Sequence, residues 1–156
     1  MNRQLINAFR GSTGRGRLVE ALKSQPLIQD GDLAEVFANR VKLEEVPFGT
    51  RVIAHDSPDH DLIFILIGEF FVSSGRQVIV RRKAGEHVGE MVLVDRDAHR
   101  SATVTAASDS IVAKISDTDF STIAERFPCL WQRVALELAQ HLRRATRHAP
   151  SRGRGF

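Results

Sequence analysis

"VGEMVLVDRDAHRSATV", residues 88–104, carries a Gly-Glu pair near its start and an arginine followed by small residues near its end. A glycine ahead of a short helical turn leaves backbone N–H groups free to bind an anion. Arg100 adds a planar, permanently charged guanidinium that suits a phosphate, and Ser101 adds a hydroxyl donor. Glu90 would repel a phosphate, but its carboxylate can accept a hydrogen bond from a sugar hydroxyl. The stretch therefore predicts a site for a phosphate joined to a ribose. The plain alternative is a solvated Glu90 and an ion-paired surface Arg100.

The segments on either side of this stretch are short and rich in Val, Ile, Phe and Thr, and turn sequences separate them. Short strands at near-regular spacing are typical of a barrel or a jelly roll. Ahead of them, residues 18–22 and 33–37 place apolar side chains at helical spacing, and Asp32 is the expected N-cap of the second helix. We therefore expect helices first and then a mainly β region within an α+β fold.

Helical periodicity returns after the strands. Ser116 or Asp117 is expected to cap one helix, and Pro128 to end it or to begin the next. The final helix, from about residue 130 to 147, carries an apolar stripe that must pack on another surface. A second chain could provide that surface, so a homodimer or a ligand-driven oligomer is expected.

The composition is that of one globular domain, with 156 residues, 42% of them hydrophobic and 26% charged. Cys129 is the single cysteine, so no internal disulfide can form. No apolar run is long enough to span a membrane, and the N-terminus lacks the apolar core of a secretory signal, so we expect a cytoplasmic protein. The basic residues after Glu137 are interpreted as a solvated helix end, because no nucleic-acid-binding motif accompanies them.

Residues 88–116 resemble the phosphate-binding cassette of the cyclic-nucleotide-binding domains, the family of the catabolite gene activator, the kinase A regulatory subunits and the cyclic-nucleotide-gated channels. The resemblance covers about residues 18 to 147, and it implies an eight-stranded jelly-roll β-barrel flanked by N-terminal and C-terminal helices. We accordingly expect a flexible N-terminus at 1–16, a cyclic-nucleotide-binding domain at 17–147 and a linker or disordered tail at 148–156. The matching cassette residues are Gly89, Glu90, Met91, Leu93, Arg100, Ser101, Ala102, Thr103 and Val104.

The resemblance also implies a role for single residues. Glu90 is expected to accept a hydrogen bond from the ribose 2'-hydroxyl, and Arg100 to pair with the cyclic phosphate. The final helix is expected to close over the base near Thr146, with His141 and Arg144 one turn away as further candidates. The expected ligand-binding residues are Val88, Gly89, Glu90, Met91, Arg100, Ser101, Ala102 and Thr146.

The sequence departs from the family pattern around the expected pocket. Val88 stands where an aromatic residue is usual, and His99 where a proline or a charged residue is common. Asp56 and Ser57 stand where many members have a glycine turn. These departures concern the pocket wall, so they bear on which base is preferred more than on binding itself.

A metal-dependent enzyme of the cupin type is a remote alternative, because six histidines are present. Such a site needs an H-x-H pair with a downstream Glu and a further His. The histidines at 55, 60, 87 and 99 do not have that spacing, so no metal site, no cofactor and no catalytic residue are expected in this chain.

The cassette and the final helix are further similar to the sensor domains of bacterial antiphage effectors of the Pycsar type. That resemblance implies a sensor in which cUMP or cCMP activates a fused TIR domain that hydrolyses NAD. The chain itself is therefore not expected to be an enzyme, although a full-length parent could carry one. A cAMP- or cGMP-binding regulatory domain of a channel, kinase or transcription regulator is the alternative. Ser101 suits a phosphate or a guanine amino group equally, so it does not decide between these ligands.

Overall fold

The computed structural model describes residues 4–75 and 77–148, with side chains described at 5–75 and 77–144. In these residues, eight strands form two four-stranded antiparallel sheets, ordered β1-β8-β3-β6 and β2-β7-β4-β5. The expected eight-stranded jelly roll is confirmed as two facing sheets, although they do not close into a barrel. The strands are β1 (Lys42–Val46), β2 (Arg51–Ile53), β3 (Asp61–Ile67), β4 (Glu69–Ser74), β5 (Gln77–Lys83), β6 (His87–Val88), β7 (Thr103–Ala106) and β8 (Ser110–Ser116).

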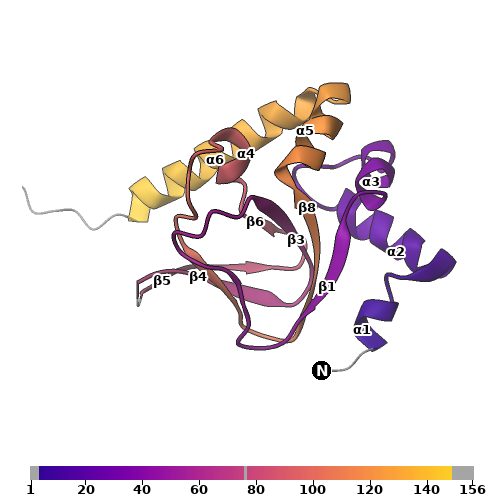
Figure 1. Ribbon diagram of the computed structural model, residues 1–156, viewed down its shortest axis with the longest axis horizontal. Coiled ribbons are helices and arrows are strands. Elements are labelled where there is room, and N and C mark those ends of the chain that lie inside the picture. Colours follow the sequence, from indigo (N-terminus) through magenta and orange to yellow (C-terminus); the bar gives the residue numbers. More distant parts are fainter. Residues whose placement is uncertain (1–3, 76, 149–156) are drawn as a thin grey trace, which may run out of the picture.

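Helices precede and follow the strands along the chain, as the sequence predicts. Figure 1 shows α2 and α3 beside β1 and β8, while the long α6 runs across the molecule next to α4. No helix among the described residues is long and apolar enough to cross a membrane. The helices are α1 (Gln4–Asn7), α2 (Gly11–Lys23), α3 (Gly31–Ala38), α4 (Met91–Val94), α5 (Asp117–Arg126) and α6 (Cys129–His148).

Strand β3 lies between two apolar cores, which explains its unbroken run of apolar residues. Side chains alternate across a strand, so Leu62 and Phe64 face the helices while Ile63 and Ile65 face the opposite sheet. All four side chains are essentially buried. Fully burying one such side chain contributes about 1.5–3 kcal/mol, so this strand anchors the sandwich to its helical layer.

The second helix begins earlier than the sequence suggests. Residues 11–16, expected within a flexible N-terminus, form the first turns of α2. A side chain at Gly14 would place its Cβ 2.5 Å from the backbone of Phe9, so glycine is what allows these two segments to touch. Arg15 also pairs with Glu35 of α3 at 2.8 Å. These tertiary contacts stabilise a turn whose composition alone favours a loop.

The N-cap residue predicted from the sequence is correct for α5 but two residues late for α3. Asp30, two residues before the expected Asp32, caps α3 by accepting a hydrogen bond from the Leu33 N–H at 2.8 Å. Asp32 lies inside the first turn, where its negative charge still suits the helix dipole. Ser116 caps α5 as expected, accepting from the Asp119 N–H at 3.1 Å.

The start of α6 is fixed to the N-terminal helices. Leu130 and Val134 are fully buried in the helical core. Arg133 donates from Nη1 to the backbone carbonyls of Leu27 and Ile28, which connect α2 to α3. The first two turns of α6 therefore move with the N-terminal layer, while its later turns extend toward the cassette.

Candidate functional site

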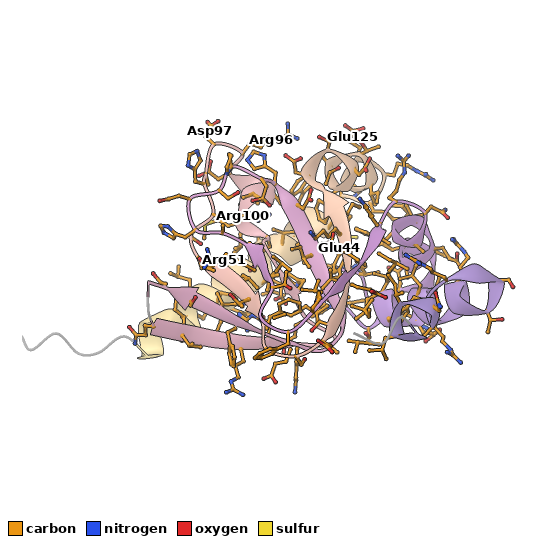
Figure 2. The ribbon with its side chains drawn as sticks, turned by 60° about the horizontal axis from the view of Figure 1, so that its bottom comes forward. Glu44, Arg51, Arg96, Asp97, Arg100 and Glu125 are labelled. Carbon is orange, nitrogen blue, oxygen red and sulfur yellow. The ribbon has the colours of Figure 1, made fainter. Side chains whose placement is uncertain are left out.

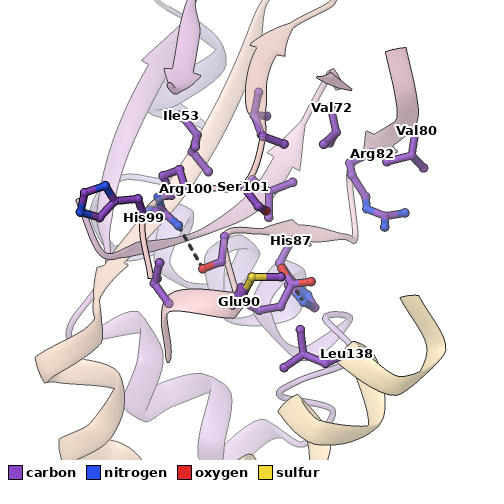
Figure 3. A pocket seen from close by; sticks show the side chains of 16 residues that line it. Ile53, Val72, Val80, Arg82, His87, Glu90, His99, Arg100, Ser101 and Leu138 are labelled. Carbon is purple, nitrogen blue, oxygen red and sulfur yellow. Dashed lines mark hydrogen bonds and ion pairs between the residues drawn. The ribbon is translucent and has the colours of Figure 1, made fainter. Parts of the chain in front are cut away.

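A cavity of about 140 Å³ lies where the sandwich, the cassette and α6 meet. Figure 3 shows Arg100 and Ser101 on one side of it, Val72, Val80 and Arg82 on another, and Leu138 approaching from α6. This one cavity is lined by seven of the expected ligand-binding residues: Val88, Gly89, Glu90, Met91, Arg100, Ser101 and Ala102. The structure therefore brings together seven of the eight residues expected to bind the ligand, while His141 and Arg144, the further candidates, are not part of the cavity wall.

The cassette turn depends on Gly89, which adopts a φ of +92°. A Cβ at this position would lie 2.7 Å from Nη1 of Arg100 and 2.9 Å from the carbonyl oxygen of Asp61. Glycine is thus required both by the backbone conformation and by the close approach of the guanidinium. The short helix α4 follows directly, so backbone N–H groups of its first turn adjoin the cavity.

Arg100 is held inside the site and is only 4% exposed. Figure 2 shows it lying within the fold, whereas Arg96 and Asp97 of the same loop project outward. Its guanidinium donates to both carboxylate oxygens of Asp59, at 2.8 and 3.4 Å, and to the carbonyls of Gly89 at 3.1 Å and Asp61 at 2.5 Å. These bonds use four of the five N–H groups of the guanidinium. They fix its plane and leave one N–H of Nη1 without a hydrogen-bond partner among the described residues.

Asp59 provides the counter-charge for Arg100. Partial burial raises the pKa of Asp59, but hydrogen bonds from Arg100 and Ser57 and the charge of Arg100 outweigh burial and lower the pKa below its ordinary 3.8. The carboxylate therefore stays ionised at neutral pH. Its side chain is 44% exposed, so water can solvate it if an incoming anion takes its place on the guanidinium.

Glu90 is the second buried charge of the cavity and is 8% exposed. Its Oε1 lies 2.8 Å from Nδ1 of His141 on α6, and its Oε2 lies 3.9 Å from Nε2 of His87. Burial raises the pKa of Glu90, but the opposing effects, the largest of which is the hydrogen bond from His141, lower it below its ordinary 4.5. The carboxylate is thus kept ionised and able to accept hydrogen bonds.

His87 lies beneath Glu90 on β6 and is almost fully buried. Burial lowers the pKa of His87 below its ordinary 6.5, and the negative charges of Glu90 and Glu137 only partly oppose that effect. In the described structure neither ring nitrogen has a hydrogen-bond partner. His87 is therefore a neutral imidazole with unused polar atoms beside the cavity.

The expected base contact at Thr146 lies outside the described side chains. Thr146 falls in the last turn of α6, but the side chains of α6 are described only to residue 144. His141, a further candidate from the sequence, reaches Glu90 directly.

Three features of the site escaped sequence analysis. Arg82 and Leu138 line the cavity, and Asp59 holds Arg100. Asp59 has a local signal, since it lies in the turn Ser57-Pro58-Asp59, but its pairing is long-range. Metal binding has no support within residues 4–75 and 77–148, where no group of three or more His, Cys, Asp and Glu side chains could hold an ion.

Comparisons with known proteins identify the family of this chain. The family model of the cyclic nucleotide-binding domain matches residues 43–127. The Pycsar effector protein BcPycTIR of Burkholderia cepacia is 41% identical over 139 residues, which cover 88% of this chain and 46% of that protein. The chain thus spans about half the length of this curated relative.

Solved structures support the same fold. The catabolite activator protein of Thermus thermophilus superposes with a TM-score of 0.71 and 21% identity, covering 78% of this chain and 60% of its own. A cyclic nucleotide-binding domain from Methylobacillus flagellatus superposes with a TM-score of 0.70 and 21% identity, covering 91% and 89%.

Proposed function

Because the chain belongs to the cyclic nucleotide-binding domain family, we propose that its cavity binds one 3',5'-cyclic mononucleotide without turning it over. The observation that carries the proposal is the pair of buried, opposite charges, Arg100 and Glu90, at one cavity. Buried charges at a cavity cluster at functional sites. In this structure Asp59 pairs with Arg100 and His141 pairs with Glu90. A ligand with a phosphate beside a ribose would interact with both charges at once.

The two ends of the ligand bind to different elements. The cyclic phosphate takes the remaining N–H of Arg100, the Ser101 hydroxyl and the N–H groups from Gly89 to Met91. The ribose 2'-hydroxyl donates to the carboxylate of Glu90. Val88 and Ala102 form the wall beside the ribose, and the base lies toward α6, near Leu138. Thr146 stays the base contact that the resemblance predicts.

Calorimetric titration with cAMP, cGMP, cUMP and cCMP tests the ligand class. The proposal expects one nucleotide to bind with a stoichiometry of one per chain. Absence of heat with all four nucleotides, in protein that is folded by circular dichroism, would refute it. The four titrations also separate the pyrimidine ligands from the alternative, a cAMP or cGMP regulatory domain.

We further propose that residues 17–147 are the sensor domain of a larger, cytoplasmic antiphage effector that responds to cUMP or cCMP. The support is the 41% identity to a Pycsar effector whose length is about twice that of the matched region. In such a parent, ligand binding would activate a TIR domain that hydrolyses NAD. NAD consumption by the full-length parent with each of the four nucleotides tests this. Hydrolysis that cUMP and cCMP fail to stimulate would contradict it.

The C-terminal helix is the proposed output of the sensor. The cassette is part of the rigid sandwich, whereas the later turns of α6 reach it across a polar contact. A ligand shifts an equilibrium only if it contacts one arrangement more than the other, and a base under α6 supplies that difference. The partly exposed side chains of Trp131 and Leu136 lie on this helix, and we propose that they contact a second copy in a homodimer or a ligand-driven oligomer. Hydrogen exchange tests the movement: ligand protection confined to residues 85–105 would argue against it.

A further inference from the structure

The later turns of α6 contact the cassette through His141. Its Nδ1 lies 2.8 Å from Oε1 of Glu90, and its side chain is 24% exposed. The neighbouring charges are Arg82 on β5 and Glu137 one turn earlier on α6. A histidine of the last helix therefore contacts Glu90, the proposed ribose acceptor in the cavity wall.

The hydrogen-bond partners of the ring determine where its proton lies. Nη2 of Arg82 is 3.2 Å from Nε2 of His141, and an arginine can only donate, so Nε2 must accept. A neutral ring then carries its hydrogen on Nδ1, which donates to Glu90. Glu137 is 3.7 Å from Nε2 and would pair with the ring only if it were doubly protonated. The contacts form a directed chain from Arg82 through His141 to Glu90.

The remaining groups around this chain keep it in place. Glu86 lies 3.5 Å from Nη1 of Arg82 and orients the guanidinium toward α6. His87 faces the other carboxylate oxygen of Glu90 at 3.9 Å from the buried side. Glu90 is thus approached by a histidine on each of its oxygens, and the side that faces α6 is already occupied.

We propose that His141 is an internal competitor for Glu90, which lowers the affinity of the site for its nucleotide until α6 is displaced. The proposal rests on the proposed function, because it assigns to Glu90 the ribose hydroxyl as its second partner. Oε2 of Glu90 faces the buried ring of His87, so Oε1 is the oxygen that a ribose hydroxyl approaches, and there the N–H of His141 already donates. A ligand therefore gains its ribose contact at the expense of the His141 contact, and this exchange couples binding to the position of α6.

The competition follows from population arithmetic. If most molecules hold the His141–Glu90 contact, the apparent dissociation constant is raised by the inverse of the competent fraction. A hydrogen bond to a charged, largely buried group is strong enough to leave only about a tenth of the molecules with Glu90 released from His141 and able to bind the ribose. Removing the imidazole therefore raises the affinity about tenfold, whereas removing a ligand-contacting residue would lower it.

Calorimetry of His141→Ala tests the proposal, with the nucleotide that binds the parent most tightly among cAMP, cGMP, cUMP and cCMP. Arg143→Ala is the matched control, because Arg143 lies two residues away on the same helix and is exposed. We expect about tenfold tighter binding for His141→Ala, an intermediate value for His141→Gln, which keeps an N–H donor, and parental binding for the control. In the ligand-free protein, amides of residues 138–144 should exchange faster in His141→Ala than in the control.

The outcomes separate the two proposals. If no nucleotide binds the parent, the proposed function fails and the competitor role fails with it. If the parent binds but His141→Ala binds equally or more weakly, only the competitor role is overturned, and weaker binding would make His141 a ligand contact instead.

Discussion

Replacing Gly89 with alanine should destabilise the fold and weaken nucleotide binding more than the same change at Gly85. The two glycines have nearly equal φ values, +92° and +91°. A left-handed backbone costs an L-residue about 1–2 kcal/mol, so both substitutions carry that strain. They differ in space: a Cβ at Gly85 meets nothing within 4 Å, whereas one at Gly89 lies 2.7 Å from Arg100 and 2.9 Å from the Asp61 carbonyl.

Crowding in a packed region costs a further 1–3 kcal/mol or so, since the Asp61 carbonyl belongs to strand β3 and cannot move freely. We therefore expect a loss in unfolding free energy of about 1–2 kcal/mol for Gly85→Ala and about 2–5 kcal/mol for Gly89→Ala. Because the added methyl displaces the guanidinium of Arg100, only Gly89→Ala should also weaken binding.

Urea unfolding followed by Trp131 fluorescence gives both free energies, and calorimetry on the folded variants gives the affinities. In thermal unfolding, each kcal/mol corresponds to a shift of about 2–4 °C for a domain of this size. Equal unfolding free energies for the two variants would show that the close approach of Gly89 to Arg100 and Asp61 has no energetic consequence, and the geometry of the cassette turn would need revision.

Three other perturbations test separate parts of the account. Arg100→Ala should weaken nucleotide binding, measured by calorimetry, by about 3 kcal/mol, roughly a hundredfold. Glu90→Ala should weaken binding less, because it removes only a ribose contact. A larger loss for Glu90→Ala than for Arg100→Ala would place the phosphate away from Arg100. Because burial lowers the pKa of His87, the unfolded chain takes up a proton below about pH 6.5 that the folded chain does not, so unfolding free energy should fall between pH 7.5 and 5.5. His87→Gln should reduce that fall, and an unchanged pH dependence in the variant would assign it to other groups. Arg133→Ala should lower the unfolding free energy by about 1.5–3 kcal/mol and speed hydrogen exchange in the first turns of α6. Exchange at parental rates would mean that apolar packing alone holds the start of α6.

Much of the fold could be predicted because local patterns determine it. Strand spacing, the Ser116 cap and the periodicity of the last helix follow from side chains within a few residues of one another. The start of α2 could not be predicted in this way. Gly14 of its first turns packs against Phe9, and Arg15 reaches Glu35, twenty residues away in the sequence, a contact that has no local signature.

The cassette residues could be predicted because they lie close together in one stretch of sequence. Arg82, Asp59 and Leu138 belong to other elements, and only the fold brings them to the cavity. Asp56 is singled out by the sequence as a departure from the family pattern, but its backbone conformation is known only from the structure. It stands where the family often has glycine, and its φ of +64° shows that the turn keeps the conformation that glycine favours, which aspartate tolerates better than most residues.

The most direct measurement of the central claim is a crystal structure of the chain grown with the nucleotide that binds most tightly. We expect a cyclic phosphate within hydrogen-bond distance of Arg100 and the N–H groups from Gly89 to Met91, with the ribose 2'-hydroxyl on Glu90. A nucleotide bound with its phosphate away from Arg100, or bound outside this cavity, would contradict it.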